Sequence, residues 1–149
     1  MLDHQRAWRW KSGAALVRAE KLHLTLHFIG AVPRQRLTQL IAELKVPFTP
    51  FELDVGQPAL WHPGLAVLEP HASPAGLLRL HEALSEALLR LDLPREMRPY
   101  RPHITLARRA GRSEAPAGQP ALRWLVQDYA LMESVAAPLD QYRLLQRYA

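Results

Sequence analysis

Two short segments of the chain alternate apolar and polar residues in the same way. The first reads Leu-His-Leu-Thr-Leu-His-Phe at residues 22–28, and the second reads Pro-His-Ile-Thr-Leu-Ala-Arg at residues 102–108. Strict alternation is typical of a strand with one buried face and one open face. In the first segment, the leucines and Phe28 are therefore expected in the core, while His23 and Thr25 share the opposite face.

The rest of the chain predicts two helices and several further strands. Apolar residues recur at helical spacing between Pro33 and Pro47, and again after Ser73 and Pro74, which are expected to cap and open a helix running to about Leu93. The remaining strands are expected at residues 51–60, 65–68, 124–135 and 141–148, with a turn at 62–64 and a loop at 110–120.

These elements indicate an α+β fold that repeats itself. Each alternating segment is followed or preceded by a helix in its own half of the chain, so we expect two similar lobes, each an antiparallel sheet with a helix packed outside. The length of 149 residues fits one such bilobal domain, residues 1–149. If the lobes are related by a pseudo-twofold axis, the two His-x-Thr pairs face each other across a cleft between them.

Composition excludes several classes of protein and of site. The chain is 48% hydrophobic and 22% charged, and it contains no long uninterrupted apolar run, which favours a globular rather than a membrane protein. No secretory signal pattern follows Met1, so a cytoplasmic location is expected. The absence of cysteine excludes disulfides, a thiolate nucleophile and Cys-bound zinc.

The net charge is strongly positive and comes almost wholly from arginine. The formal charge is +5, and of the 19 basic residues only Lys11, Lys21 and Lys45 are lysine. The guanidinium fork matches phosphate oxygens, so a nucleotide or nucleic-acid partner is one interpretation. A solvated surface rich in arginine would look the same, and charge alone does not decide between the two.

The two His-x-Thr pairs suit phosphodiester cleavage. One imidazole can accept a proton from the attacking oxygen while the other donates a proton to the leaving oxygen. The hydroxyls of Thr25 and Thr105 could donate to the non-bridging phosphate oxygens as charge develops on them. No histidine and carboxylate cluster has metal-ligand spacing, so neither a metal nor another cofactor is expected.

Three further residues are possible substrate contacts. Arg108 could clamp a phosphate, although strict alternation places it on the face opposite His103 unless a bulge turns it back. Trp61 and Tyr100 are expected in loops beside the cleft, where their rings could stack on a base or merely cover an edge of the core. His27 lies roughly 13 Å from His23 along a strand, so we interpret it as a structural or rim residue.

The chain resembles the 2H phosphoesterase superfamily, and within it the RNA 2′,3′-cyclic phosphodiesterases, also called the 2′-5′ RNA ligase family. The resemblance rests on residues 22–30 and 98–108, with Leu-Met-Glu-Ser at 131–134 and Tyr-Arg-Leu at 142–144. It implies a cleft between two lobes and a substrate that is RNA or a nucleotide with a 2′,3′-cyclic phosphate. It also implies hydrolysis to the 2′-phosphate.

The same resemblance implies a role for each motif residue. His23 would protonate the leaving oxygen, His103 would activate water, and Thr25 and Thr105 would hold the phosphate. A monomer is expected. Relative to the family, a first apolar strand is missing, because the start was assigned too late, because the chain was trimmed, or because this lobe is smaller.

Alternative functions remain open at this point. Within the superfamily these are reversible 2′-5′ RNA ligation and hydrolysis of a small cyclic phosphate. From another class comes a non-catalytic RNA-binding module, in which basic loops bind phosphates and the histidines only line the groove.

Overall fold

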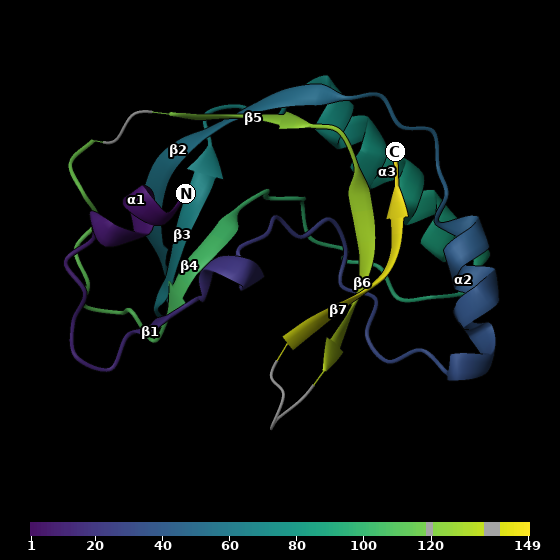
Figure 1. Cartoon of the computed structure of the whole chain (residues 1–149), viewed down its shortest axis with the longest axis horizontal. Coiled ribbons are helices and arrows are strands. Elements are labelled where there is room, and N and C mark those ends of the chain that lie inside the picture. Colours follow the sequence, from purple (N-terminus) through teal and green to yellow (C-terminus); the bar gives the residue numbers. More distant parts are fainter. Residues whose placement is uncertain (119–120, 136–140) are drawn as a thin grey trace. The chain divides into compact units, whose positions relative to one another are not determined.

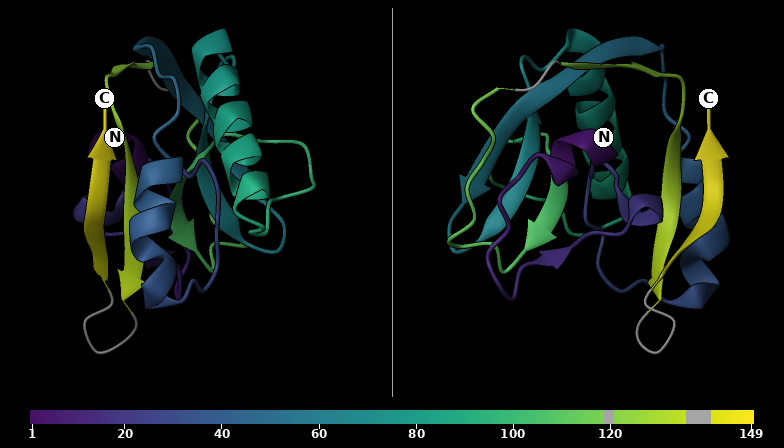
Figure 2. Two further views of the ribbon diagram at one scale, coloured as in Figure 1. Left: turned by 90° about the vertical axis from the view of Figure 1, so that its right-hand side faces the viewer. Right: turned by 60° about the vertical axis from the view of Figure 1, so that its left-hand side comes forward.

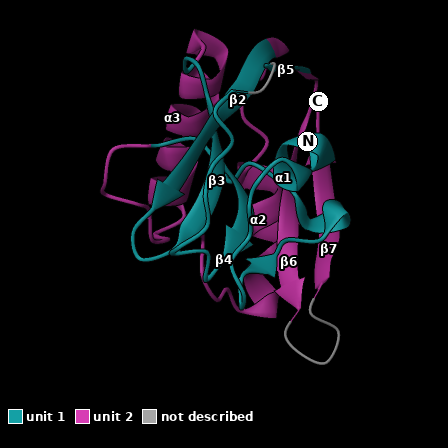
Figure 3. Cartoon of the chain, turned by 90° about the vertical axis from the view of Figure 1, so that its left-hand side faces the viewer, with its two compact units in different colours: residues 1–25, 52–73, 101–124 teal, residues 26–51, 74–100, 125–149 magenta. Residues whose placement is uncertain are grey.

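The computed structural model describes residues 1–118, 121–135 and 141–149, and these residues form two compact units. Unit 1 comprises residues 1–25, 52–73 and 101–124, and unit 2 comprises residues 26–51, 74–100 and 125–149 (Figure 3). Each unit is assembled from three separate stretches of chain, because the strands and helices close on partners that are distant in sequence.

Unit 1 is built around an antiparallel sheet whose strand order is β1-β4-β3-β2-β5 (Figure 1). The strands are β1 Ala15–Leu16, β2 Phe51–Trp61, β3 Leu65–Pro70, β4 Ile104–Arg108 and β5 Leu122–Val126, and β2 and β5 extend into unit 2 at one end each. The helix α1, Leu2–Arg6, precedes β1 in the chain, and the 3-10 turn η1, Ala19–Lys21, follows β1. The core of this unit consists mainly of aliphatic side chains on β2, β3 and β4: Leu53, Val55, Val67, Leu68, Ile104 and Leu106.

Unit 2 combines helices with a two-stranded antiparallel sheet. Its elements are the 3-10 turn η2 Arg34–Arg36, the helices α2 Leu37–Glu43 and α3 Ala75–Arg90, and the strands β6 Tyr129–Val135 and β7 Gln141–Tyr148 (Figure 2). The helix α3 buries a stripe of residues at helical spacing: Leu77, Leu80, Leu84, Ala87 and Leu88. Antiparallel sheets and helices confirm the α+β class.

No helix within the described ranges is both long and apolar enough to cross a membrane.

The first alternating segment does not form the expected strand. Residues 22–28 make a single antiparallel bridge, at Leu24, and the alternation of burial holds only as far as Leu26. Beyond that point His27 is half-buried and Phe28 is 81% exposed, so the expectation of Phe28 in the core is wrong. The backbone leaves the extended pairing after Leu24, and the two-residue period of side-chain direction ends with it.

Several expected element boundaries also change. The stretch expected as one strand at 124–135 is two strands, β5 and β6, separated at Gln127 and Asp128. Pro74 rather than Ser73 is the N-cap residue of α3, and that helix ends at Arg90 instead of about Leu93. The expected loop at 110–120 has no named element up to residue 118, and residues 119–120 lie outside the described residues.

Candidate active site

The bridge between Leu24 and Ile104 brings the two His-x-Thr motifs side by side in unit 1. In an antiparallel pair, the residues flanking a bridged pair also lie opposite each other. This register sets His23 against Thr105, and Thr25 against His103. Directly opposed side chains have Cβ atoms about 5 Å apart, and diagonal neighbours roughly 7–8 Å.

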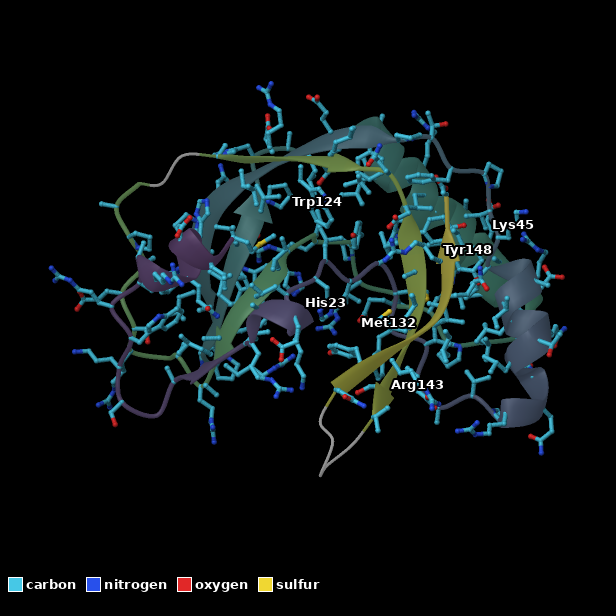
Figure 4. The ribbon with its side chains drawn as sticks, in the orientation of Figure 1. His23, Lys45, Trp124, Met132, Arg143 and Tyr148 are labelled. Atoms are coloured by element: carbon cyan, nitrogen blue, oxygen red, sulfur yellow. The ribbon has the colours of Figure 1, made fainter. Side chains whose placement is uncertain are left out.

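The four polar side chains of the motifs share one face of this pairing. Ile104 is fully buried and Leu24 is half-buried, so the neighbours on either side point the other way. His23 and Thr25 are exposed, while His103 and Thr105 are half-buried. Two imidazoles and two hydroxyls therefore alternate around one small area of surface, with each histidine beside the threonine of the other motif. Figure 4 shows His23 on the segment that follows η1.

Both histidines are held in the same way by the backbone two residues earlier. The Nδ1 atom of His23 lies 2.6 Å from the carbonyl oxygen of Lys21, and that of His103 lies 2.8 Å from the carbonyl oxygen of Arg101. A carbonyl oxygen only accepts hydrogen bonds, so each Nδ1 must carry the proton and donate it. Each ring therefore presents Nε2 as its reactive nitrogen, an acceptor when the ring is neutral and a donor when it is protonated.

A bulge in β4 returns Arg108 to the face of the motif. Ala66 of β3 pairs with Ala107, and the next residue, Val67, pairs with Thr105, so β4 holds one extra residue between these pairs. A bulge of this kind reverses the alternation beyond it. The burial agrees, because Leu106 and Ala107 are both buried and Arg108 is exposed. The strict alternation expected from sequence, which pointed Arg108 away from His103, is interrupted here.

Trp61 contacts His103 directly. It is the last residue of β2 rather than a loop residue, and its ring centroid lies 4.4 Å from that of His103 at a tilt of 53°. The guanidinium of Arg101 lies 4.1 Å from the centroid of the Trp61 ring, and its Nε donates to Glu69 at 2.8 Å. The Arg101 side chain is thus fixed twice, and its own carbonyl is the one that holds His103.

Sequence reasoning missed the part played by Arg101 and Glu69. Arg101 precedes His103 by two residues, the same offset as Lys21 from His23, and this shared offset was the one available signal. Glu69 gives no such signal, because its place beside Arg101 depends on how β3 pairs with β4.

Tyr100 belongs to unit 2, where its ring stacks on His81 with centroids 3.9 Å apart. His81 in turn stacks on His27 at 4.1 Å, and Nε2 of His27 donates to the His81 carbonyl at 2.9 Å. Burial raises the pKa of Tyr100 above its usual value. Burial first, and the neighbouring His27 second, lower the pKa of His81 to about 4. His27 thus packs within unit 2, as the structural interpretation expected.

Among the residues that the structure describes, no group of three or more His, Asp or Glu side chains is arranged to hold a metal ion.

Comparisons with known proteins agree on one family. The model of the 2′-5′ RNA ligase superfamily matches residues 3–147. A protein of Thermus thermophilus named RNA 2′,3′-cyclic phosphodiesterase is 31% identical, covering 87% of this chain and 72% of the relative. A protein of the same name from Escherichia coli (strain K12) is 34% identical, covering 89% and 78%. The crystal structure of E. coli LigT complexed with NADP+ matches with a TM-score of 0.82 at 26% identity, covering 98% and 86%.

Proposed function

The chain belongs to the 2′-5′ RNA ligase superfamily, and we propose that it hydrolyses the 2′,3′-cyclic phosphate of RNA or nucleotides to a 2′-phosphate without a metal or other cofactor. The observation that carries the proposal is the Leu24 to Ile104 bridge, which sets two imidazoles and two hydroxyls on one face. The names of the relatives from Thermus thermophilus and Escherichia coli support the same reaction.

The two histidines divide the proton transfers between them. Nε2 of neutral His103 takes a proton from water as the water oxygen attacks phosphorus. The bond between phosphorus and the 3′-oxygen breaks, and protonated His23 donates its Nε2 proton to that leaving oxygen. The two Nδ1 hydrogen bonds suit this division, because they orient both rings with Nε2 as the working atom.

The threonines and Arg108 act on the phosphate itself. The hydroxyls of Thr25 and Thr105 donate to the non-bridging oxygens, whose negative charge grows in the transition state. Arg108, on the same face beyond the bulge, adds a positive charge that favours binding of the anionic substrate. Trp61 shields one side of His103 from water and offers an aromatic edge near the nucleoside.

The test is turnover of a 2′,3′-cyclic nucleotide by purified variants. His23→Ala and His103→Ala should each lower kcat by about 10² to 10⁴, the usual value of one general acid or base. His71→Ala is the matched control, because His71 is an exposed histidine of the same unit. Circular dichroism on the same samples separates a lost proton transfer from a lost fold. Wild-type rates in either motif variant would refute the two-histidine mechanism.

A further inference from the structure

Three arginines at and just beyond the C-terminal end of β4 have no carboxylate partner among the described residues. Arg108, Arg109 and Arg112 are exposed, and none forms an ion pair within the described part of the chain. Other arginines of unit 1 each lie within 4 Å of a carboxylate oxygen: Arg6, Arg9, Arg18, Arg101 and Arg123. Among the arginines of unit 1 that the structure describes, those without an ion pair therefore lie together, in the turn at residues 108–112.

This turn is held firmly by the turn between β2 and β3. The amide of Ala110 donates to the carbonyl of Gly64 at 2.8 Å, and the amide of Ser113 donates to the carbonyl of Ala110 at 2.8 Å. The two turns are in close contact: a Cβ on Gly64 would lie 2.9 Å from the Gly111 amide nitrogen, and one on Gly111 would lie 2.9 Å from the Pro63 carbonyl oxygen. The backbone that carries Arg109 and Arg112 is thus held in place by the neighbouring turn.

Arg109 also has a backbone conformation that arginine rarely adopts. Its φ is 54°, in the left-handed region where residues other than glycine are uncommon. Such conformations persist where the surroundings impose them, and they are frequent at binding sites. Here the surroundings are the hydrogen bond at Ala110 and the contact with Gly64.

The position of the turn relative to the candidate site follows from β4. The same strand carries Thr105 and, after the bulge, leads directly into Arg109 four residues later, a separation of at most roughly 13 Å along the chain. Arg109 therefore follows the residues of the two motifs along the chain and lies outside the His-x-Thr face itself. That position suits a second phosphate farther along a bound chain.

We propose that Arg109 and Arg112 bind backbone phosphates of an RNA strand on the 5′ side of its cyclic phosphate terminus. The inference rests on the proposed function, and it names the polymer rather than the mononucleotide as the favoured substrate. A cyclic mononucleotide has no upstream phosphate and gains nothing from these arginines. Arginine suits the role, because its planar fork matches the phosphate oxygens, and a rigid backbone lowers the ordering cost of binding.

The test compares two substrates as the salt concentration is varied. One is a cyclic mononucleotide, and the other is an RNA oligonucleotide that ends in a 2′,3′-cyclic phosphate. The variant carries Arg109→Asn, which tolerates the left-handed conformation, together with Arg112→Gln. The control carries Arg6→Gln and Arg123→Gln, which remove the same formal charge from exposed, ion-paired positions of unit 1.

On the oligonucleotide, kcat/KM of the variant should fall about tenfold. The slope of its plot of log kcat/KM against log salt concentration should become less negative by about 1.4, which is roughly 0.7 for each lost phosphate contact with a single strand. Its rate on the mononucleotide and the control's rates on both substrates should stay near wild type. An equal loss on both substrates, or an unchanged salt slope on the oligonucleotide, would overturn the inference.

A binding measurement keeps this result separate from the proposed reaction. Fluorescence anisotropy with a labelled oligonucleotide that ends in a 3′-phosphate requires no turnover. If the Arg109 and Arg112 variant binds the oligonucleotide more weakly than the wild type while the control does not, the inference is supported. This holds even if the wild type hydrolyses neither substrate, a result that would refute the proposed function. Equal binding by wild type, variant and control would refute the inference even in an active enzyme.

Discussion

At the level of single residues, the position of one proton on each histidine ring decides what the site can do. The carbonyl oxygens of Lys21 and Arg101 fix the proton of each ring on Nδ1, so in the proposed mechanism proton exchange with the substrate takes place at Nε2. The two rings are equivalent in this respect. In the proposed mechanism, their different roles therefore come from the orientation of the substrate between them, in line with the attacking water and the leaving oxygen.

The threonines test the phosphate-binding part of the proposal. Thr25→Val and Thr105→Val keep the branched shape of the side chain and remove only the hydroxyl donor. Each should lower kcat on a cyclic nucleotide by about 10² to 10³, the cost of one oxyanion donor, while Thr38→Val, a threonine on α2 in the other unit, should not. Full activity in Thr25→Val and Thr105→Val would exclude the hydroxyls from the reaction.

At the level of helices and strands, the alternation of apolar and polar residues predicted β4 and the exposed face of His23 and Thr25 correctly. It did not predict the bulge in β4. Leu106 and Ala107 are both apolar, so the alternation of apolar and polar residues does not indicate which of them is the extra residue. The bulge follows from pairing with β3, a contact that a single segment of sequence does not encode.

The break between β5 and β6 was missed for a related reason. The chain from Trp124 to Val135 reads as one continuous strand, yet the two strands belong to different sheets. Tyr129 lies just after the break and is buried, and its hydroxyl donates to the Leu44 carbonyl and accepts from the Val46 amide. These partners lie more than 80 positions away in the sequence, so the periodicity of residues 124–135 cannot predict the contact.

The packing of α3 against Phe51 leads us to expect that Gly76→Ala destabilises the protein, although alanine favours a helix more than glycine does. Gly76→Ala normally favours a helix by up to about 1 kcal/mol, but here the new Cβ would lie 2.8 Å from the Cβ and ring of Phe51. We expect the free energy of unfolding to fall by roughly 1–3 kcal/mol, as in other overpacked sites. Gly118→Ala, where nothing lies within 4 Å, should be nearly neutral. Urea unfolding measures the free energy of unfolding of both variants. A higher value for Gly76→Ala than for the wild type would contradict this expectation and would show that the Phe51 ring can move aside.

Over the molecule as a whole, charge is distributed unevenly. The net charge of +5 includes many arginines that are paired with carboxylates, and these contribute little long-range attraction for an anion. In the proposed binding of RNA, the unpaired arginines at 109 and 112 therefore matter more than the total charge suggests. The sequence alone left a nucleic-acid partner and an ordinary solvated surface equally open, because pairing is visible only in the folded chain.

The stability of the molecule should depend on pH through His81. Because burial and His27 lower the pKa of His81 to about 4 from an unfolded value of 6.5, the folded state binds fewer protons between these values. The stabilisation from His81 is thus complete above about pH 6.5 and is lost as the pH falls toward 4.

The matched variant is His81→Phe, which keeps a ring between His27 and Tyr100 but does not titrate. The free energy of unfolding in urea should fall more steeply from pH 7 to pH 4.5 in the wild type than in His81→Phe. The same dependence in both proteins would exclude His81 as a source of acid sensitivity.

Hydrolysis of a cyclic phosphate by two histidines without a metal can be decided by a single digest. Wild-type protein treated exhaustively with EDTA is incubated with a 2′,3′-cyclic nucleotide, and the products are identified by phosphorus NMR against authentic 2′- and 3′-monophosphates. We expect undiminished turnover and the 2′-monophosphate as the sole product, because in the proposed mechanism His23 protonates the leaving 3′-oxygen. No turnover, or turnover that returns only when zinc or magnesium is added, would contradict the two-histidine mechanism.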